Sequence, residues 1–351
     1  MAWLRNCWYV AMWAQDLKAG ALESRTIIGE NIVLYRCADG SIAALQNRCP
    51  HRFAPLHMGK LGADGCTLRC GYHGLEFGPD GQCVGNPHGE GRIPPALAVK
   101  SYAAVEKHSL VWVWMGDRTP DEAAIPDYSL LDAADQSTTS ARDCLQMDVD
   151  YRLIVDNLLD LSHVSFLHDG ILGNEETIRA DIQAEERDDT VTVSRYMPDV
   201  PPPELFDMLF RRDGRHVDLW ASMRWNAPAC LLNDAGVKAV GDERRNGTGI
   251  FGIHILTPQT ERSTLYHFAA VRQNPIAFPP DEAQGIARRL TELRRYAFAE
   301  QDEPMIRAQQ AVIDGADGPL EPVLLPIDVG PVRYKRILER LIQQEALPHR
   351  A

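Results

Sequence analysis

The 351-residue sequence predicts an α+β protein with two domains. The first, at residues 1–135, is expected to be all-β, and the second, at residues 136–351, to combine helices with an antiparallel sheet. Three observations support this prediction. The chain is too long for one ordinary hydrophobic core. Short strands and tight turns dominate its first third. Beyond about residue 140, helical segments alternate with strands, an order typical of helices on one face of an antiparallel sheet.

Short strands with turn signals between them predict the all-β domain, from about residue 25 to residue 115. Residues 26–35 are predicted to form one strand and residues 41–45 the next, with the turn signal Ala38-Asp39-Gly40 between them. Pro79-Asp80-Gly81 is a second turn signal, and Leu110–Trp114 is a further strand. Two loops that carry cysteine and histidine lie between such strands, so we expect them at the tips of a small antiparallel sheet.

The second domain begins after a change in composition. Residues 117–139 are rich in Pro, Asp and Ala and predict a linker. Alternating apolar and polar residues predict strands at Val191–Arg195, Leu219–Trp225, Thr248–Leu256 and Ser263–Arg272. Helices are predicted at residues 148–168, from about residue 281 with a break or kink near Pro304, and at residues 331–345.

The composition argues against several kinds of partner. With 36 basic and 49 acidic residues the net charge is −13, which disfavours binding to nucleic acid or to an anionic membrane surface. No apolar run approaches the roughly 18 residues of a membrane span, and no signal peptide is recognised. We therefore expect a cytoplasmic protein. The cysteines outside the motifs described next are expected to be reduced thiols: Cys7, Cys37, Cys66, Cys83, Cys144 and Cys230.

Two cysteine–histidine pairs in the first quarter of the chain predict an iron–sulfur cluster. Cys49 and His51 form a C-x-H pair, and Cys70 and His73 form a C-x-x-H pair, with 18 residues between His51 and Cys70. A Rieske [2Fe–2S] cluster has two thiolates on one iron and two imidazoles on the other. Zinc is the alternative, but zinc motifs usually pair Cys with Cys and His with His. Each loop here offers one of each, which favours the cluster.

A second metal site is predicted around His163 and His168. Two histidines and a carboxylate form the facial triad that binds non-haem Fe(II) and leaves positions open for O₂ and substrate. The histidines lie about 140° apart on an ideal helix, so the helix must end between them or contain a π-type turn. Asn157 and Asp160 precede them at helical spacing, which a solvent-facing polar stripe would also explain. The apolar neighbours of these residues favour a buried site instead.

The carboxylate of this triad is not fixed by the residues alone. Glu300, Asp302 and Glu303 are all candidates, and their spacing does not rank them.

Taken together, these motifs resemble the Rieske non-haem iron oxygenases. The segments that carry the resemblance are residues 49–56, 72–77, 81–84, 86–89 and 254–258. They are most similar to a short-chain group that contains dicamba O-demethylase, vanillate O-demethylase and toluenesulfonate methyl-monooxygenase. The resemblance implies an N-terminal Rieske domain and a C-terminal helix-grip domain.

The resemblance also implies roles for individual residues. The implied cluster ligands are Cys49, His51, Cys70 and His73, and the implied ligands of the mononuclear iron are His163, His168 and Asp302. Asp302 is selected by aligning Gln309 and Gln310 with a feature of the family. Asp160 would link an iron-ligand histidine to a Rieske histidine of the neighbouring subunit, and Asn157 would lie near the iron. Asn233 and His254 would hydrogen-bond a substrate carboxylate.

The implied activity is that of the terminal oxygenase component of a multicomponent monooxygenase. It would use O₂ to demethylate or hydroxylate a methyl or methoxy group on an aromatic acid. Electrons from NADH would arrive through a separate flavin reductase, a ferredoxin or both, because the chain has no G-x-G-x-x-G motif after a strand. A homotrimer would place one subunit's cluster beside the next subunit's iron. The alternatives are a phenoxybenzoate-type diaryl-ether dioxygenase, an N-demethylase, a ring hydroxylase, and a Rieske electron carrier without catalytic activity.

Overall fold

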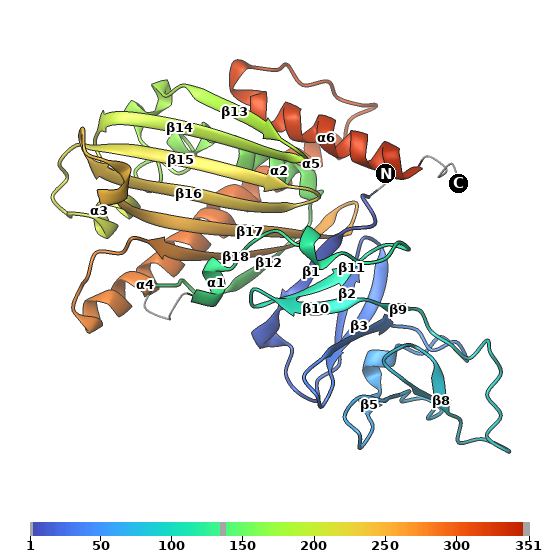
Figure 1. The fold of residues 1–351 in the computed structure, drawn as a ribbon. Helices are drawn as coiled ribbons and strands as arrows, with labels where there is room; N and C mark the ends of the chain where they lie inside the picture. The colour runs from blue at the N-terminus through green and yellow to red at the C-terminus, as the bar shows by residue number, and fades with distance from the viewer. Residues whose placement is uncertain (1–2, 134–137, 347–351) are drawn as a thin grey trace. The chain divides into compact units, whose positions relative to one another are not determined.

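The computed structural model describes residues 3–133 and 138–346. The chain divides into two compact units (Figure 1). One contains residues 5–127 and 257–260. The other contains the described parts of residues 1–4, 128–256 and 261–351. The predicted boundary between residues 135 and 136 falls within residues 134–137, outside the described residues, and stays a prediction.

The N-terminal unit is built from short antiparallel strands. Its described strands form three sheets, in the orders β1-β11-β10, β2-β3-β4-β9 and β5-β6-β7-β8. The first two sheets contain β1 (Trp8–Trp13), β11 (Leu110–Trp114), β10 (Ala104–Lys107), β2 (Glu23–Ile27), β3 (Glu30–Arg36), β4 (Ile42–Gln46) and β9 (Ser101–Tyr102). The third contains β5 (Lys60–Leu61), β6 (Leu68–Arg69), β7 (Glu76–Phe77) and β8 (Cys83–Gly85). The predicted all-β character is therefore confirmed.

One predicted strand of this unit is divided by a tight turn. Residues 26–35 form the end of β2 and most of β3, because the chain reverses at Ile28 and Gly29, where φ is 42° and 81°. The amide groups of these two residues donate to the carbonyl oxygens of Pro258 and Gln259. The apolar, β-branched residues around the turn hid it from the sequence prediction, although Gly29 tolerates the positive φ without strain.

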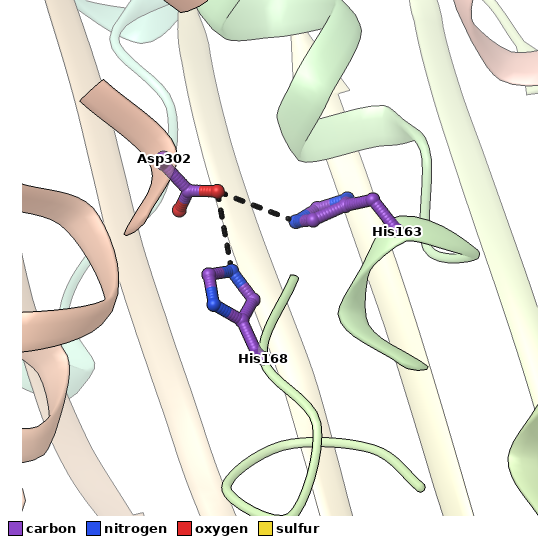
Figure 2. A group of neighbouring side chains, drawn as sticks. All are labelled: His163, His168 and Asp302. Carbon is purple, nitrogen blue, oxygen red and sulfur yellow. Dashed lines mark ion pairs between the residues drawn. The ribbon is translucent and has the colours of Figure 1, made fainter. Parts of the chain in front are cut away.

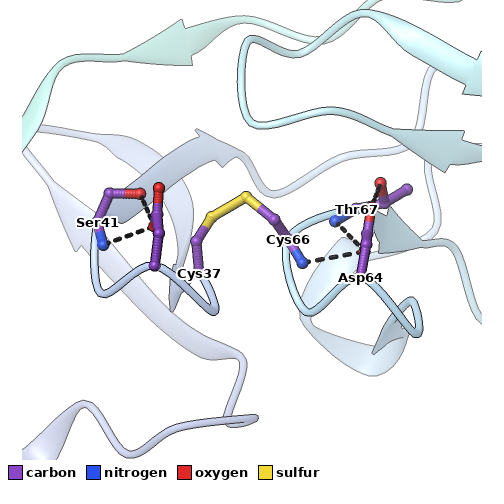
Figure 3. The surroundings of a disulfide bond; sticks show 6 residues. Cys37, Ser41, Asp64, Cys66 and Thr67 are labelled. Atoms are coloured by element: carbon purple, nitrogen blue, oxygen red, sulfur yellow. Dashed lines mark hydrogen bonds between the residues drawn. A yellow bond between two sulfur atoms is a disulfide. The ribbon is translucent and has the colours of Figure 1, made fainter.

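A disulfide in the N-terminal unit corrects the prediction for two cysteines. Cys37 and Cys66, 29 residues apart, are bonded to each other rather than reduced (Figure 3). Aspartates brace both loops: Asp39 accepts hydrogen bonds from Ser41, and Asp64 accepts them from the amide groups of Cys66 and Thr67. Two loops held in this way bring together cysteines whose spacing in the sequence carries no recognisable signal.

Removing this disulfide is expected to destabilise the N-terminal unit. A Cys37→Ala/Cys66→Ala double variant should lose about 2–4 kcal/mol of unfolding free energy, because the closed loop no longer restricts the unfolded chain. Urea unfolding monitored by tryptophan fluorescence would measure the loss. Cys83→Ala, which removes a free thiol of the same unit, is the control. Two free thiols at positions 37 and 66 in the folded wild type would contradict the assignment.

The C-terminal unit contains a seven-stranded antiparallel sheet in its described residues, in the order β12-β18-β17-β16-β15-β14-β13. The strands are β12 (Asp143–Met147), β13 (Ile182–Arg187), β14 (Thr190–Val200), β15 (Val217–Asn226), β16 (Cys230–Ala239), β17 (Thr248–Thr260) and β18 (Ser263–Gln273). The four strands predicted from the sequence are all present. The structure adds β12, β13 and β16, whose charged or small residues weaken the alternating pattern.

Helices cover one face of this sheet. They are α2 (Tyr151–Leu159), α3 (Glu204–Leu209), α4 (Pro280–Tyr296), α5 (Glu303–Asp314) and α6 (Val329–Ala346), and the short helix α1 (Leu130–Ala133) precedes β12 in the chain. Leu219 and Trp225 on β15 point to the same face because they lie six positions apart, an even number. Leu219 packs in a core with Leu290 of α4, and the ring of Trp225 lies 5.3 Å from that of Tyr334 of α6. The predicted α+β class is confirmed.

The helix predicted at residues 148–168 is wrong in its second half. α2 spans only Tyr151–Leu159, with Asp150 as its N-cap and Asp160 as its C-cap. By contrast, the predicted break near Pro304 and the predicted last helix are confirmed by α4, α5 and α6. No helix of the described residues is both long and apolar enough to cross a membrane.

Candidate metal centres

The two cysteine–histidine loops of the N-terminal unit close in the same way. The amide of Cys49 donates to the carbonyl of Ala54, and the amide of Cys70 donates to the carbonyl of Leu75. In each loop the residue before that carbonyl, Phe53 or Gly74, donates back to the cysteine carbonyl and has positive φ. Two unrelated stretches of sequence thus adopt one backbone shape, which presents the first cysteine and a following histidine.

The cysteine and histidine side chains of these loops differ in burial. Both thiols, of Cys49 and Cys70, are buried in the same apolar core, whereas His51 is exposed and His73 half-buried. The two imidazole rings lie 4.5 Å apart, centroid to centroid. Paired thiols inside and paired imidazoles outside fit a cluster in which one iron takes the cysteines and the other the histidines.

In the C-terminal unit, His163, His168 and Asp302 come together (Figure 2). One ligand atom from each lies within 4.8 Å of the others. Oδ1 of Asp302 lies 3.6 Å from Nε2 of His163 and 3.2 Å from Nε2 of His168. Asp302, at least 134 positions after the histidines in the sequence, therefore meets them at one point. A donor set of two imidazoles and a carboxylate fits a mononuclear non-haem iron.

The end of α2 positions the two histidines. The helix stops at Leu159, and His163 begins a 3₁₀ turn, His163–Ser165, after which the chain continues to His168. Asp160 ends the helix, and its carboxylate accepts a hydrogen bond from the Ser162 amide. The early helix end lets both rings face one point, which five-residue spacing on a continuous helix would not allow.

A π-helical turn presents the carboxylate. Residues Ala297–Asp302 form this turn between α4 and α5. Pro304 has no amide hydrogen to donate to the carbonyl of Glu300, so the α-helical hydrogen-bond ladder is interrupted there. Of the three candidate carboxylates, Asp302 is buried beside the histidines, whereas Glu300 is exposed and Glu303 half-buried. Of the two alternatives predicted near His163, the helix end and not the π-type turn is found there, although the end precedes His163, and the π-helical turn belongs to the segment that carries Asp302.

Each histidine is oriented by a hydrogen bond at its Nδ1 atom. Nδ1 of His163 donates to the backbone carbonyl of Asp160, and Nδ1 of His168 donates to Oε1 of Gln301 at 2.8 Å. Since both partners are acceptors, the ring proton sits on Nδ1 and the Nε2 lone pair faces Asp302. Carboxylate or carbonyl partners of this kind are typical of metal-binding histidines. Gln301 is not among the residues predicted from the sequence to belong to this site.

Burial and charge act differently on the two imidazoles. Burial lowers the pKa of His163, which keeps its ring neutral, as metal binding requires. Burial also lowers the pKa of His168, but the hydrogen bond to Asp302, the charge of Asp302 and the hydrogen bond to Gln301 together outweigh it, so the pKa of His168 rises overall. The Asp302 carboxylate therefore favours a positive charge between itself and the two imidazoles, and a bound metal cation would supply that charge.

A Gln301→Met variant is expected to lower iron affinity by about 10- to 100-fold, because His168 would lose the acceptor that orients its ring. Competition with a chelator, followed by elemental analysis, would measure the affinity. Gln309→Met on the exposed side of α5 is the matched control. Unchanged affinity in Gln301→Met would mean that packing alone orients His168.

The remaining predicted residues lie around the same site. Asn157, on the last turn of α2, donates from Nδ2 to Oδ1 of Asp302 at 3.1 Å. Asp160 holds His163 through its backbone carbonyl, while its half-buried carboxylate is bonded to Ser162. Asn233 on β16 and His254 on β17 line the cavity next to the histidines.

This cavity has a volume of about 100 Å³ and is lined by residues of the C-terminal unit. Its walls are mostly apolar, with Leu158, Met223 and Ile250 among them, and His163, His168 and Asp302 lie at its surface. An arginine, Arg294 of α4, also lines it. A largely apolar cavity with a few polar groups and a metal-ligand set on its wall is the usual form of a small-molecule site.

His254 is a neutral hydrogen-bonding group within this cavity. Burial, and then the nearby Arg294, lower the pKa of His254 well below its ordinary value. Burial raises the pKa of Tyr266, so its hydroxyl stays protonated, and it lies within hydrogen-bond distance of Nδ1 of His254, at 2.5 Å. With this hydroxyl as the donor, the ring proton of His254 is on Nε2, where it can donate to a ligand.

Two family profiles match the chain. The Rieske [2Fe-2S] domain matches residues 7–103, and the vanillate O-demethylase oxygenase C-terminal domain matches residues 147–344. The two profiles contain the two sets of candidate ligands described above.

Full-length relatives are also found. The oxygenase component of chloroacetanilide N-alkylformylase from Rhizorhabdus wittichii is 38% identical, over 98% of this chain and 97% of its own. The oxygenase component of dicamba O-demethylase from Stenotrophomonas maltophilia is 36% identical, over 99% and 100%. The crystal structure of dicamba monooxygenase bound to 3,6-dichlorosalicylic acid matches with a TM-score of 0.90 at 34% identity, covering 99% and 100% of the two chains.

Proposed function

The chain belongs to the Rieske non-haem iron oxygenases, as an oxygenase component that uses a [2Fe–2S] cluster and a mononuclear iron. We propose which reaction it catalyses and which of its residues bind the cluster and the iron. The reaction is the oxidation of a methyl or methoxy group on an aromatic acid. The cluster ligands are Cys49, His51, Cys70 and His73, and the iron ligands are His163, His168 and Asp302. The dicamba O-demethylase relative, named for removing an O-methyl group, supports the proposed reaction.

One observation carries the proposal: two Nε2 lone pairs and a carboxylate converge on the wall of an apolar cavity. Three ligands on one side leave the cavity side open for O₂ and a substrate. When bound, the iron activates O₂ with electrons that arrive through the cluster. The chain's own contribution is to hold the aromatic ring near that open side and to exclude water with the apolar walls.

The overall reaction balances without a further oxidant. O₂, two electrons and two protons give one oxygen atom to the substrate and one to water. If the oxidised carbon belongs to a methoxy group, its hydroxylated form breaks down to a phenol and formaldehyde. If it belongs to a ring methyl group, the product is a benzylic alcohol.

The proposal includes partners and an assembly. The electrons come from NADH through a separate flavin reductase, with or without a ferredoxin, since the family members above are named as components of larger systems. We also propose a cytoplasmic homotrimer in which Asp160 connects the iron of one subunit to the cluster of the next. The half-buried position of the Asp160 carboxylate beside His163 supports this role.

The test is turnover with defined products. The purified protein would be supplied with a reductase, NADH, O₂ and a panel of methoxylated, methylated and phenoxy-substituted aromatic acids. A phenol and formaldehyde formed in equal amounts would support O-demethylation, and a benzylic alcohol methyl hydroxylation. Reductase-dependent reduction of the cluster, with no product from any compound, would contradict the proposal and favour an electron carrier.

A second candidate is dealkylation at an amide nitrogen. The relative of 38% identity is named as a chloroacetanilide N-alkylformylase, so an anilide belongs in the same panel. A dealkylated anilide with no conversion of any acid would favour N-dealkylation as the reaction. The assignment of the metal-ligand residues would be unaffected.

A further inference from the structure

Arg294 occupies a position in α4 where an arginine is unexpected. Leu290, Leu293 and Ala297 form the buried stripe of this helical run, and Arg294 lies on the same stripe. Its side chain is 7% exposed and lines the cavity of the iron site. The helix therefore brings a guanidinium into an apolar cavity instead of directing it to solvent.

Among the described residues, this guanidinium lacks polar partners. Nε and Nη2 of Arg294 are buried without a hydrogen bond. Its nearest neighbours include the rings of Phe298, 5.2 Å from Cζ, and Phe268, at 6.0 Å. Burial lowers the pKa of Arg294 to about 10, so the group is still charged at neutral pH. A buried charge without a counter-ion is strongly unfavourable, which points to a group that the folded chain does not itself supply.

The other charged groups that line the cavity, Arg195 and Asp302, already have partners within the chain. Arg195 also lines the cavity, but its two Nη atoms donate to the carbonyl oxygens of Leu161 and Thr177. The Asp302 carboxylate is engaged by His163, His168 and Asn157. Arg294 thus differs from Arg195 in having its donors unused, although both are buried in one cavity.

Arg294, His254 and Asn233 surround one point of the cavity wall. A Cβ atom placed on Gly252 would lie 3.2 Å from Nη1 of Arg294, 2.9 Å from Nε2 of His254 and 3.1 Å from Cβ of Asn233. Asn233 and Gly252 are paired across β16 and β17. The absence of a side chain at Gly252 leaves room for a guanidinium and an imidazole N–H to approach the same ligand.

We propose that Arg294 is the charge-recognising residue of the cavity and restricts the substrate to organic anions, with a carboxylate or sulfonate held by the guanidinium and by Nε2 of His254. This inference rests on the proposed function, because it places the anion in the oxygenase cavity. A planar guanidinium can donate two parallel hydrogen bonds to such a group, and it contributes the charge that the neutral His254 and Asn233 lack.

Binding measured without turnover tests this assignment. Isothermal calorimetry under anaerobic conditions would compare 4-methoxybenzoate, 4-methoxybenzenesulfonate and the neutral 4-methoxybenzamide on the holoprotein. Arg294→Gln is expected to weaken anion binding by about 30-fold or more, since one partner of a buried charge pair is lost. Binding of the amide should stay within a few-fold of wild type. Arg295→Gln is the control, because it removes an exposed guanidinium from the adjacent position of the same helix.

Two further variants guard against misfolding of Arg294→Gln. Arg294→Lys keeps the charge and should retain part of the affinity for the anions. Gly252→Ala keeps the guanidinium but adds a methyl group against Nε2 of His254 and Nη1 of Arg294, so these side chains must shift and anion binding should weaken. The two anions distinguish carboxylate from sulfonate as the preferred group.

Equal weakening of the anions and the amide in Arg294→Gln would overturn the proposal in favour of a packing role. Failure of the wild type to bind either anion would overturn it as well. Arg294-dependent anion binding without product from any acid would leave the inference standing and defeat the proposed reaction. Turnover of acids that is unaffected by Arg294→Gln would support the proposed reaction and overturn the assignment of Arg294.

Discussion

Replacing Asp302 by asparagine is expected to abolish turnover and remove the mononuclear iron, while the absorption spectrum of the [2Fe–2S] cluster stays unchanged. Asparagine has the same shape and can still accept the hydrogen bond from Asn157, so the change isolates the negative charge. Loss of an outer partner of a metal ligand lowers affinity by 10- to 100-fold, so loss of a ligand charge should lower it by more than about 100-fold. Elemental analysis, cluster absorbance and product formation would be measured together.

A matched control for this variant lies two residues away. Glu300→Gln makes the same change in charge on the same π-helical turn, at an exposed position, and should have no effect on iron content. Full iron content in Asp302→Asn would show that a different carboxylate is the ligand. Full function without the iron would favour the electron-carrier alternative.

Replacing Cys70 by serine is expected to eliminate the cluster and, with it, reductase-dependent turnover. The thiol is 2% exposed and packs with Cys49 in the core of the N-terminal unit, so an unpaired hydroxyl in its place also destabilises that unit. The iron site lies in the other unit and should keep its metal. Paramagnetic resonance of the reduced protein and elemental analysis would separate these two effects.

Cys83→Ser serves as the control, since it changes a free, half-buried cysteine on β8. Zinc without acid-labile sulfide in the wild type would contradict the cluster assignment and support the Cys₂His₂ zinc site. A Cys70→Ser protein that retains the cluster spectrum would exclude this residue as a ligand.

Local spacing alone predicts the cluster loops, whereas the geometry of the second site depends on the fold. Cys49, His51, Cys70 and His73 lie in two short loops, so the ligand pattern is visible in the sequence itself. His163 and His168 could also be recognised, but not their geometry, because the predicted helix continued past Leu159. The structure ends it at Asp160, whose backbone carbonyl then holds His163.

Groups that depend on contacts distant in sequence could not be predicted in this way. Spacing did not separate Asp302 from Glu300 and Glu303, because their burial depends on which side of the π-helical turn faces the sheet. The pair Cys37 and Cys66 had no sequence signal for the same reason. A signal for Arg294 did exist, since it lies four residues after Leu290 and four before Phe298, on the buried stripe of α4.

The helical run through α4 and the π-helical turn carries both Arg294 and Asp302, with eight residues from one to the other. At about 1.5 Å of rise per residue in an α-helix, and less in the π-helical turn, this is at most about 12 Å of helix axis. The charged end of a substrate and the atom to be oxidised would therefore be held at a separation set by the backbone of a single rigid element. If the anion binds at Arg294, the distance from the anionic group to each ring substituent determines which substituent is oxidised. A ring position at the matching distance from the charge should be oxidised, and its isomers should bind equally well but react slowly.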